Sequence, residues 1–575
     1  MNWFPFHLGK PLLDRSAAWL RLNSKTALAL IVVAVLAPFL AKPFSLDEPL
    51  FLWAGQHLLD QPLNPYGFEV NWFGYTTPMW EATKNPPLCC YYLAGAASLL
   101  GWSEVALHAA FLLPALAAIL GTFRLAQRFC RQPVFAAAAT LLTPVFLVSG
   151  TTVMCDVLML VFWVWAVVFW VEGTQNQRGL FLATAGCLVA LAALTKYFGA
   201  SLIVLLAAYS LTARARPARW IPPLLLPLAV LGAYHLATRN LYGHSLLADA
   251  VNYAVPPASL ADFAALKSAS CLSALAFLGG GLALATFFLP FLWRWRTICG
   301  FAVAAFLLAA ILLLAGPLLK DYGPVQGSSR TLIGLQLLFW ATGGAGILAL
   351  AVVDLRGRRD AEAWLLALWV LGTFCFAAFI NWTVNGRTVL PLAPAVGILL
   401  ARRLEQTRPE PDRSGVLVRS LVFAAGAALA LLVARADFLF AKSVRSSALT
   451  TYSKFGHEPH FRFQGHWGFQ YYLRAAGAEA LDVRHTLLQR GDIIATPENN
   501  TNFSPLGADL VVLREVILSS GPRWLATMKG EVGAGFYAAS RGPLPFAFGW
   551  VPPDRVVVCA VDPLIPPVRS DSSGR

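Results

Sequence analysis

Two adjacent carboxylates, Asp47 and Glu48, follow the first long apolar run, and a lysine, Lys84, closes the polar stretch that they open. A carboxylate can remove a proton, and an ammonium group can bind an anion, so this stretch is a candidate reaction site. Neighbouring side chains on a helix diverge by about 100°, so the two acids should not act on one atom. We predict that Asp47 is a general base and that Glu48 binds a substrate hydroxyl or orients the site.

A structural alternative exists for this acidic pair. Ser45 or Asp47 would then only cap a helix that begins at Pro49, because these residue types favour the N-cap and proline favours the first turn.

Further ionisable groups stand at the ends of apolar runs. Lys84 and Asn85 precede Pro86-Pro87, and a lysine at lipid headgroup depth can pair with a phosphate, although it can also simply snorkel. Charged groups inside apolar segments are usually functional or paired. The candidates for substrate or phosphate binding are Lys84, Asn85, Asp156, Lys196, Arg330 and Arg387, with Arg330 closer in character to an interfacial anchor.

One carboxylate together with several Lys and Arg side chains meets the requirements of one reaction, the transfer of a sugar from a polyprenyl phosphate. A sugar on a polyprenyl phosphate already carries a good leaving group, so its transfer needs no acid to protonate the departing oxygen, unlike glycoside hydrolysis. It needs one base for the proton of the acceptor and cations for the phosphate.

The composition indicates a polytopic α-helical membrane protein. Hydrophobic residues make up 57% of the 575 positions and charged residues 13%, and the mean hydropathy is +0.61. Apolar runs near the roughly 20 residues that cross a bilayer recur along the chain. The net charge of +14 comes from arginine clusters between apolar runs, which is typical of cytoplasmic loops and does not indicate nucleic-acid binding. The scattered cysteines predict neither disulfides nor zinc.

Arginine clusters also predict the topology. A basic leader keeps the N-terminus inside, so the loop with Asp47 emerges outside. The run 86–100 is too short to cross and is predicted to lie at the interface, whereas 179–212 must be two short spans that meet outside at Lys196. About thirteen spans result, N-in and C-out, near 26–43, 104–126, 133–150, 153–171, 179–212 (two), 220–238, 271–293, 297–319, 331–353, 361–380, 388–401 and 415–434.

Two domains are predicted. Residues 1–435 form the membrane domain, with a first outer loop at 44–103. Residues 436–575 form a small soluble α/β domain on the outer side, with a helix after Gly465, strands at 492–496 and 555–561, and a disordered tail after Pro567.

Metal ligands are not indicated. His244 with Asp249, and His457 with His460 and His466, fit no recognised ligand spacing. No cofactor is predicted, although a divalent metal is compatible with the sequence.

Several short motifs together resemble the GT-C membrane glycosyltransferases. Within that class the chain is most similar to the protein O-mannosyltransferase-like family 39 group, which includes the lipid A aminoarabinose transferase. The similarity covers about residues 25–400, and its motifs are Leu46-Asp47-Glu48, Lys84-Asn85-Pro86-Pro87-Leu88, Leu99 to Glu104, Met154-Cys155-Asp156, Leu194 to Gly199 and Asn385-Gly386-Arg387.

The resemblance implies a polyprenyl-monophosphate-sugar donor, inversion at the anomeric carbon and a base from the first outer loop, which maps to Asp47. It implies phosphate contacts, which Lys84 and Arg387 match best. We expect transfer of a single sugar to an acceptor protein or glycolipid at the periplasmic face of a bacterial inner membrane. The competing hypotheses are a flippase of a lipid-linked glycan, which should show internal symmetry, and a non-catalytic membrane scaffold.

Overall fold

The computed structural model describes residues 23–254, 260–314, 327–407, 413–504, 506–507 and 510–562, without the side chains of 254, 260–268, 312–314, 327–329 and 413. Most of the basic leader and the tail after Pro567 therefore lie outside the described residues.

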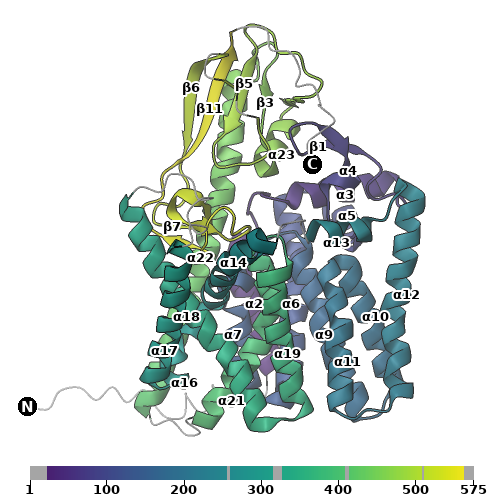
Figure 1. Ribbon diagram of the computed structural model, residues 1–575. Coiled ribbons are helices and arrows are strands. Elements are labelled where there is room, and N and C mark those ends of the chain that lie inside the picture. Colours follow the sequence, from purple (N-terminus) through teal and green to yellow (C-terminus); the bar gives the residue numbers. More distant parts are fainter. Residues whose placement is uncertain are drawn as a thin grey trace, which may run out of the picture.

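Helices form a bundle that carries a smaller strand-containing part at one end (Figure 1). Among the described residues, six helices are long and apolar enough to span a membrane, or seven if one bent pair is a single span. The predicted fold class is confirmed, while the count of about thirteen spans and the N-in, C-out orientation stay predictions. The bundle comprises α2 (Ser24–Leu36), α6 (Glu104–Phe129), α7 (Pro133–Leu141), α8 (Pro144–Gly150), α9 (Cys155–Gln175), α10 (Gly179–Thr195), α11 (Ser201–Thr212), α12 (Pro217–Tyr242), α14 (Leu260–Gly281), α15 (Ala283–Phe287), α16 (Leu289–Leu292), α17 (Trp295–Leu314), α18 (Gly327–Arg358), α19 (Ala361–Cys375), α21 (Ala393–Thr407) and α22 (Arg413–Phe455).

Breaks in the apolar runs follow local chemistry. The run 179–212 is two helices, as predicted, because Lys196 is extended and a short 3-10 turn (Tyr197–Ala200) follows it. The run 133–150 differs from a straight span, because α7 and α8 meet at 63°. Thr143 caps α8 by accepting a hydrogen bond from the Phe146 N–H, and Pro144 lacks the N–H that would continue α7.

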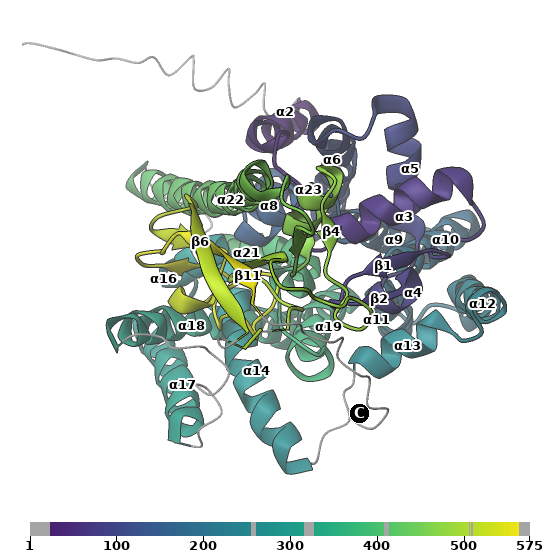
Figure 2. The same ribbon diagram turned by 90° about the horizontal axis from the view of Figure 1, so that it is seen from above.

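The first outer loop lies across one end of the bundle (Figures 1 and 2). It contains α3 (Glu48–Asp60), the hairpin of β1 (Glu69–Asn71) and β2 (Thr76–Pro78), α4 (Met79–Ala82) and α5 (Leu88–Leu100). Helix α5 lies beside α3 instead of descending between the long helices (Figure 2), as expected for a 13-residue apolar helix. Helix α13 (Leu246–Ala254) lies at the same end (Figure 1).

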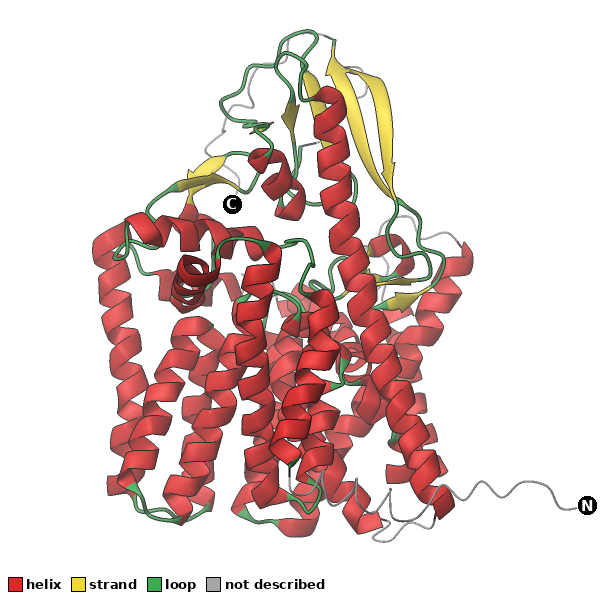
Figure 3. Ribbon diagram, turned by 180° about the vertical axis from the view of Figure 1, so that it is seen from behind, coloured by secondary structure: helices red, strands yellow, loops and turns green. Residues whose placement is uncertain are grey.

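The C-terminal part contains a five-stranded mixed sheet in the order β4-β3-β5-β11-β6. Its strands are β3 (Arg462–Phe463), β4 (Glu479–Ala480), β5 (Ile493–Pro497), β6 (Val511–Ser519) and β11 (Asp554–Val561), and α23 (Trp467–Ala475) precedes β4. The predicted strands and aromatic helix are thus present. Helix α22 is continuous over 43 residues and rises from the bundle to flank the sheet (Figure 3), so the predicted boundary at 436 falls inside it.

A second C-terminal region packs on the membrane domain. It contains β7 (Leu525–Ala526), β8 (Met528–Lys529), β9 (Ala534–Gly535) and β10 (Ala547–Phe548). Its buried residues, among them Phe536 and Tyr537, belong to the same hydrophobic cluster as the bundle helices, whereas the five-stranded sheet has a separate core. We call residues 523–551 the returning segment.

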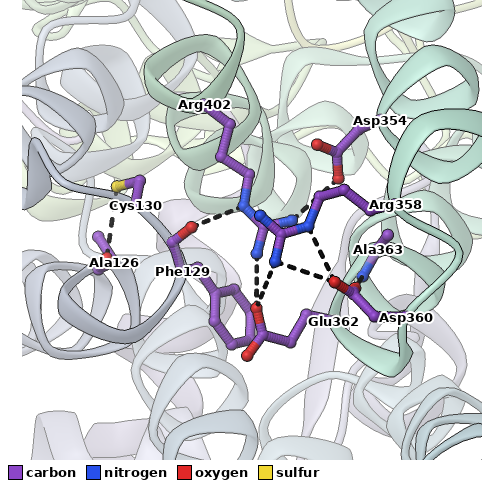
Figure 4. Close-up of polar contacts among 9 residues, drawn as sticks. All are labelled: Ala126, Phe129, Cys130, Asp354, Arg358, Asp360, Glu362, Ala363 and Arg402. Atoms are coloured by element: carbon purple, nitrogen blue, oxygen red, sulfur yellow. Dashed lines mark hydrogen bonds and ion pairs between the residues drawn. The ribbon is translucent and has the colours of Figure 1, made fainter. Parts of the chain in front are cut away.

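A buried arginine, Arg402, joins four helices (Figure 4). The Arg402 guanidinium on α21 donates to the Phe129 carbonyl at 2.7 Å, to Asp354 at 2.9 Å and to Glu362 at 2.8 Å. Arg358 adds a longer contact of 3.5 Å to Glu362. Because α6, α18, α19 and α21 each contribute a group, this cluster ties the ends of these helices together.

We expect Arg402→Leu to destabilise the protein strongly, because it leaves the buried Asp354 carboxylate without its partner. Removing one member of a buried ion pair costs about 3–5 kcal/mol. Thermal unfolding in detergent should show a lowered Tm. Arg358→Leu is the matched control, since Arg358 contacts the same Glu362 but is 37% exposed, and exposed pairs contribute about 0–1 kcal/mol. Equal shifts of Tm in the two variants would contradict the assignment.

Candidate active site

Asp47 forms an ion pair with Arg387. Asp47 occupies the N-cap of α3 but makes no side-chain capping bond, so the capping role considered for it is not seen. Its carboxylate instead lies 2.9 Å from the Arg387 guanidinium, with side chains 33% and 17% exposed. The preceding Leu46 has a φ of +49°, a left-handed conformation that is unusual for a bulky residue. The backbone is therefore held in a strained turn where it presents Asp47.

Arg387 is presented by α20 (Gly386–Val389), in the connection between α19 and α21. Asn385 and Thr388 form a capping box that starts this short helix just before the predicted span 388–401. The guanidinium also lies 3.4 Å from the Met154 sulfur, and its Nε has no hydrogen-bond partner among the described residues. Burial lowers the pKa of Arg387, but Asp47 and Asp156 outweigh it and raise the pKa overall, so the cation is retained.

Glu48 occupies a different environment from its neighbour. Its side chain is fully buried, and its two oxygens accept hydrogen bonds from the backbone N–H groups of Ser45 at 2.5 Å and Val153 at 2.8 Å. Burial raises the pKa of Glu48 to about 7, against the opposing effects of Lys42 and of these two hydrogen bonds. These contacts join the first outer loop to the start of α9, which favours the orienting role for Glu48.

Asp156 and Lys196 form a second ion pair of 2.6 Å. Asp156 is buried in the first turn of α9, and Lys196 stands at the break after α10. The other Asp156 oxygen, Oδ2, has no partner among the described side chains and backbone groups. Because Arg387 contacts the Met154 sulfur, two positions before Asp156, and the charge of Asp156 acts on Arg387, the two ion pairs lie near each other.

Lys84 is a half-buried cation in the turn between α4 and α5. No hydrogen bond or ion pair links it to another described residue. Burial lowers the pKa of Lys84, while Asp249 and Glu81 act in the opposite direction. Asn85 is held in place beside it, because its carbonyl accepts a hydrogen bond from the buried Tyr66 hydroxyl at 2.9 Å. The Asn85 side chain reaches the Cys155 thiol at 3.7 Å, next to Asp156.

Arg330 takes part in neither the Asp47–Arg387 ion pair nor the Asp156–Lys196 ion pair. It is exposed near the start of α18, the helix that packs against the Gly530–Val532 turn of the returning segment.

Four residues near the site were not predicted for it. Lys42 and Asp437 form a buried ion pair of 2.5 Å, and Asp437 also accepts a hydrogen bond from Tyr537. His466 is close enough for Asp47 to influence it, although burial is the larger effect and lowers the pKa of His466 to about 4. Asp437 could have been identified from the sequence, because it is an acid close to the end of the apolar run 415–434. The sequence carries no comparable signal for Tyr537.

Three of the residues considered as metal ligands, His244, Asp249 and His466, have protein partners. His244 pairs with Asp249 at 2.5 Å, and His466 Nδ1 lies 2.9 Å from the Thr501 carbonyl. Within the described part of the chain, no three His, Cys, Asp or Glu side chains converge on one point.

Comparison with known proteins gives one family match. Residues 84–236 match the family described as dolichyl-phosphate-mannose-protein mannosyltransferase. No curated protein matches the chain.

Two similar solved structures are ArnT from Cupriavidus metallidurans bound to undecaprenyl phosphate and the oligosaccharyltransferase AglB from Archaeoglobus fulgidus. ArnT is 16% identical, with a TM-score of 0.43 over 84% of this chain and 94% of that one. AglB is 14% identical, with a TM-score of 0.47 over 81% of this chain and 66% of that one.

The family match spans the part of the chain that contains Lys84, Asn85, Asp156 and Lys196, and over residues 84–236 it confirms the predicted resemblance to the GT-C, protein O-mannosyltransferase-like membrane glycosyltransferases.

Proposed function

We propose that this protein transfers a single sugar, with inversion, from a polyprenyl monophosphate to an acceptor protein or glycolipid. The observation that carries the proposal is the Asp47–Arg387 pair. It combines a partly exposed carboxylate with a largely buried cation at the end of the bundle where the first outer loop lies (Figure 1). The donor class is supported by the matched family, which is described as acting with dolichyl phosphate-linked mannose.

The proposed reaction is a single displacement. Asp47 accepts the proton of an acceptor hydroxyl as that oxygen bonds to the anomeric carbon of the sugar. The bond between this carbon and the phosphate oxygen breaks, and its electron pair leaves with the polyprenyl phosphate. Arg387 and Lys84 bind the phosphate, whose charge grows during bond breaking. When the donor phosphate binds Arg387, it competes with Asp47 for the guanidinium and frees the carboxylate to act as a base.

Supporting groups keep these side chains in place. Glu48 fixes the first outer loop against α9 through its bonds to Ser45 and Val153. Lys196 neutralises one oxygen of Asp156, and the other oxygen is left to orient Arg387 or a sugar hydroxyl.

The direct test uses purified protein in sealed proteoliposomes with undecaprenyl-phosphate-linked sugars, and envelope lipids and proteins are added as acceptors. We expect release of undecaprenyl phosphate, together with the mass of one sugar on an acceptor, detected by mass analysis. Movement of intact donor across the bilayer without cleavage would instead identify a flippase.

The proposed location is the periplasmic face of a bacterial inner membrane. A cysteine introduced at the highly exposed Leu63 of the first outer loop, in a background without the native cysteines, should react with an impermeant maleimide from outside intact spheroplasts. A cysteine at Arg131, at the opposite end of α6, should not. The reverse pattern would overturn the location and the predicted topology.

Lys84→Gln is expected to raise the KM for the donor about 10- to 100-fold, because a charged hydrogen bond to the phosphate contributes about 1.5–3 kcal/mol. Since burial lowers the pKa of Lys84, the ammonium group loses its proton at a lower pH than an ordinary lysine, so the wild-type KM should rise as pH rises through this range. Lys84→Arg should keep its charge and remove most of that rise. Steady-state kinetics across alkaline pH measures both effects, and an unchanged KM in Lys84→Gln would exclude Lys84 from donor binding.

A further inference from the structure

The returning segment is bonded directly to the connection that carries Arg387. The Gly386 N–H donates to the Phe536 carbonyl at 2.7 Å, and the Ala539 N–H donates to the Val384 carbonyl at 2.7 Å. A side chain at Gly386 would meet the Phe536 ring, because a Cβ there would lie 2.5 Å from that ring. The two segments therefore fit together at backbone distance, on both sides of Tyr537.

Tyr537 lies between Arg387 and a buried acid. The Arg387 guanidinium lies 5.7 Å from the centroid of the Tyr537 ring, within the range of a cation–π contact. The phenol hydroxyl donates to Asp437 Oδ2 at 2.9 Å. Burial and the charge of Asp437 raise the pKa of Tyr537, so the hydroxyl keeps the proton that it donates.

The same acid reaches the loop that carries Asp47. Asp437 pairs with Lys42 at 2.5 Å, and the two side chains are 1% and 0% exposed. Lys42 lies five positions before Asp47. Charges on Lys42 and Asp437 also influence Glu48. One series of contacts thus runs from Arg387 through Tyr537, Asp437 and Lys42 back to the first outer loop.

We infer that Tyr537 is a positioning residue, through which the returning segment sets the Arg387 guanidinium opposite Asp47. The inference rests on the proposed function for its catalytic consequence. A displaced guanidinium would no longer meet the phosphate of the donor, and misplacement by about 1 Å can cost 100-fold in rate. Asp437 and Lys42 act only by holding Tyr537 and the first outer loop.

The test compares Tyr537 with Thr527, because both side chains donate a hydrogen bond to Asp437. Thr527, also buried, donates to Asp437 Oδ1 at 2.8 Å but makes no contact with the guanidinium. We expect Tyr537→Leu to lower kcat/KM for the donor about 30-fold, and Tyr537→Phe, which keeps the ring, to lower it less. Thr527→Val should stay within about threefold of wild type even though its Tm falls. Losses that follow Tm equally in all three variants would overturn the inference.

A second readout is independent of activity. Asp47→Asn should lower Tm in the wild-type protein, and by a similar amount in the Thr527→Val variant. In the Tyr537→Leu variant the same substitution should lower Tm by less than half as much, because the Asp47–Arg387 ion pair is already misaligned there. Non-additive shifts of this kind identify coupled residues. Additive shifts for Tyr537→Leu would refute the positioning role. If wild-type protein transfers no sugar, the proposed function fails, and this cycle still decides the role of Tyr537.

Discussion

Asp47→Asn is expected to lower sugar transfer by about 1,000-fold, because a general base contributes about 100- to 10,000-fold and asparagine cannot accept the proton. The variant should fold, since Asp47 is one-third exposed and its amide replacement can still contact Arg387. Donor binding should be kept or strengthened, because both cations proposed to bind the phosphate remain and Asp47 no longer competes for the Arg387 guanidinium. The measurement is the initial rate of undecaprenyl phosphate release at saturating donor.

Asp60→Asn is the matched control for this experiment. Asp60 is an exposed acid at the other end of α3, so it tests the loss of one negative charge on the same helix, and its rate should remain near that of wild type. If Asp47→Asn protein is intact and transfers sugar normally, the base lies elsewhere. The scaffold hypothesis would then gain support over the enzyme.

Arg387→Met is expected to reduce kcat/KM for the donor by about 100- to 1,000-fold, the range found when one donor to a developing negative charge is removed. Methionine approximates the length of the side chain but carries no charge. The variant should remain folded, because the Asp47 carboxylate is partly exposed to water and the Asp156 carboxylate keeps its ion pair with Lys196. Arg387→Lys should recover only part of the activity, since an ammonium cannot bind phosphate as a planar fork.

Arg445→Met provides the control for Arg387. Arg445 pairs with Glu104 at 3.2 Å and is 44% exposed. Its substitution therefore removes an arginine and an ion pair, as Arg387→Met does, but removes no contact that is proposed to bind phosphate. We expect its kinetics within about twofold of wild type. The double variant Asp47→Asn with Arg387→Met should be only slightly worse than the worse single variant, because residues that act as a unit are strongly non-additive. Multiplicative losses would mean that the two residues work in separate steps.

Much of the candidate site could be predicted because charge is scarce in this chain. An ionisable group at the end of an apolar run is costly unless it is paired or used, and this rule selected Asp156, Lys196 and Arg387, which the structure places together. Arg330 met the same criterion and lies apart on α18, since the rule identifies unusual charges without specifying their neighbours.

The sequence by itself determined the helical membrane class, the break at Lys196 and the strands of the C-terminal sheet, because hydrophobic length and strand composition are local properties. Only the tertiary structure decided which charges pair, as in Asp47 with Arg387 and Lys42 with Asp437. It also decided that Tyr537 returns to the bundle and that Glu48 is buried while Asp47 is not. The physical reason is that pairing and burial depend on contacts between segments hundreds of residues apart, which no local pattern encodes.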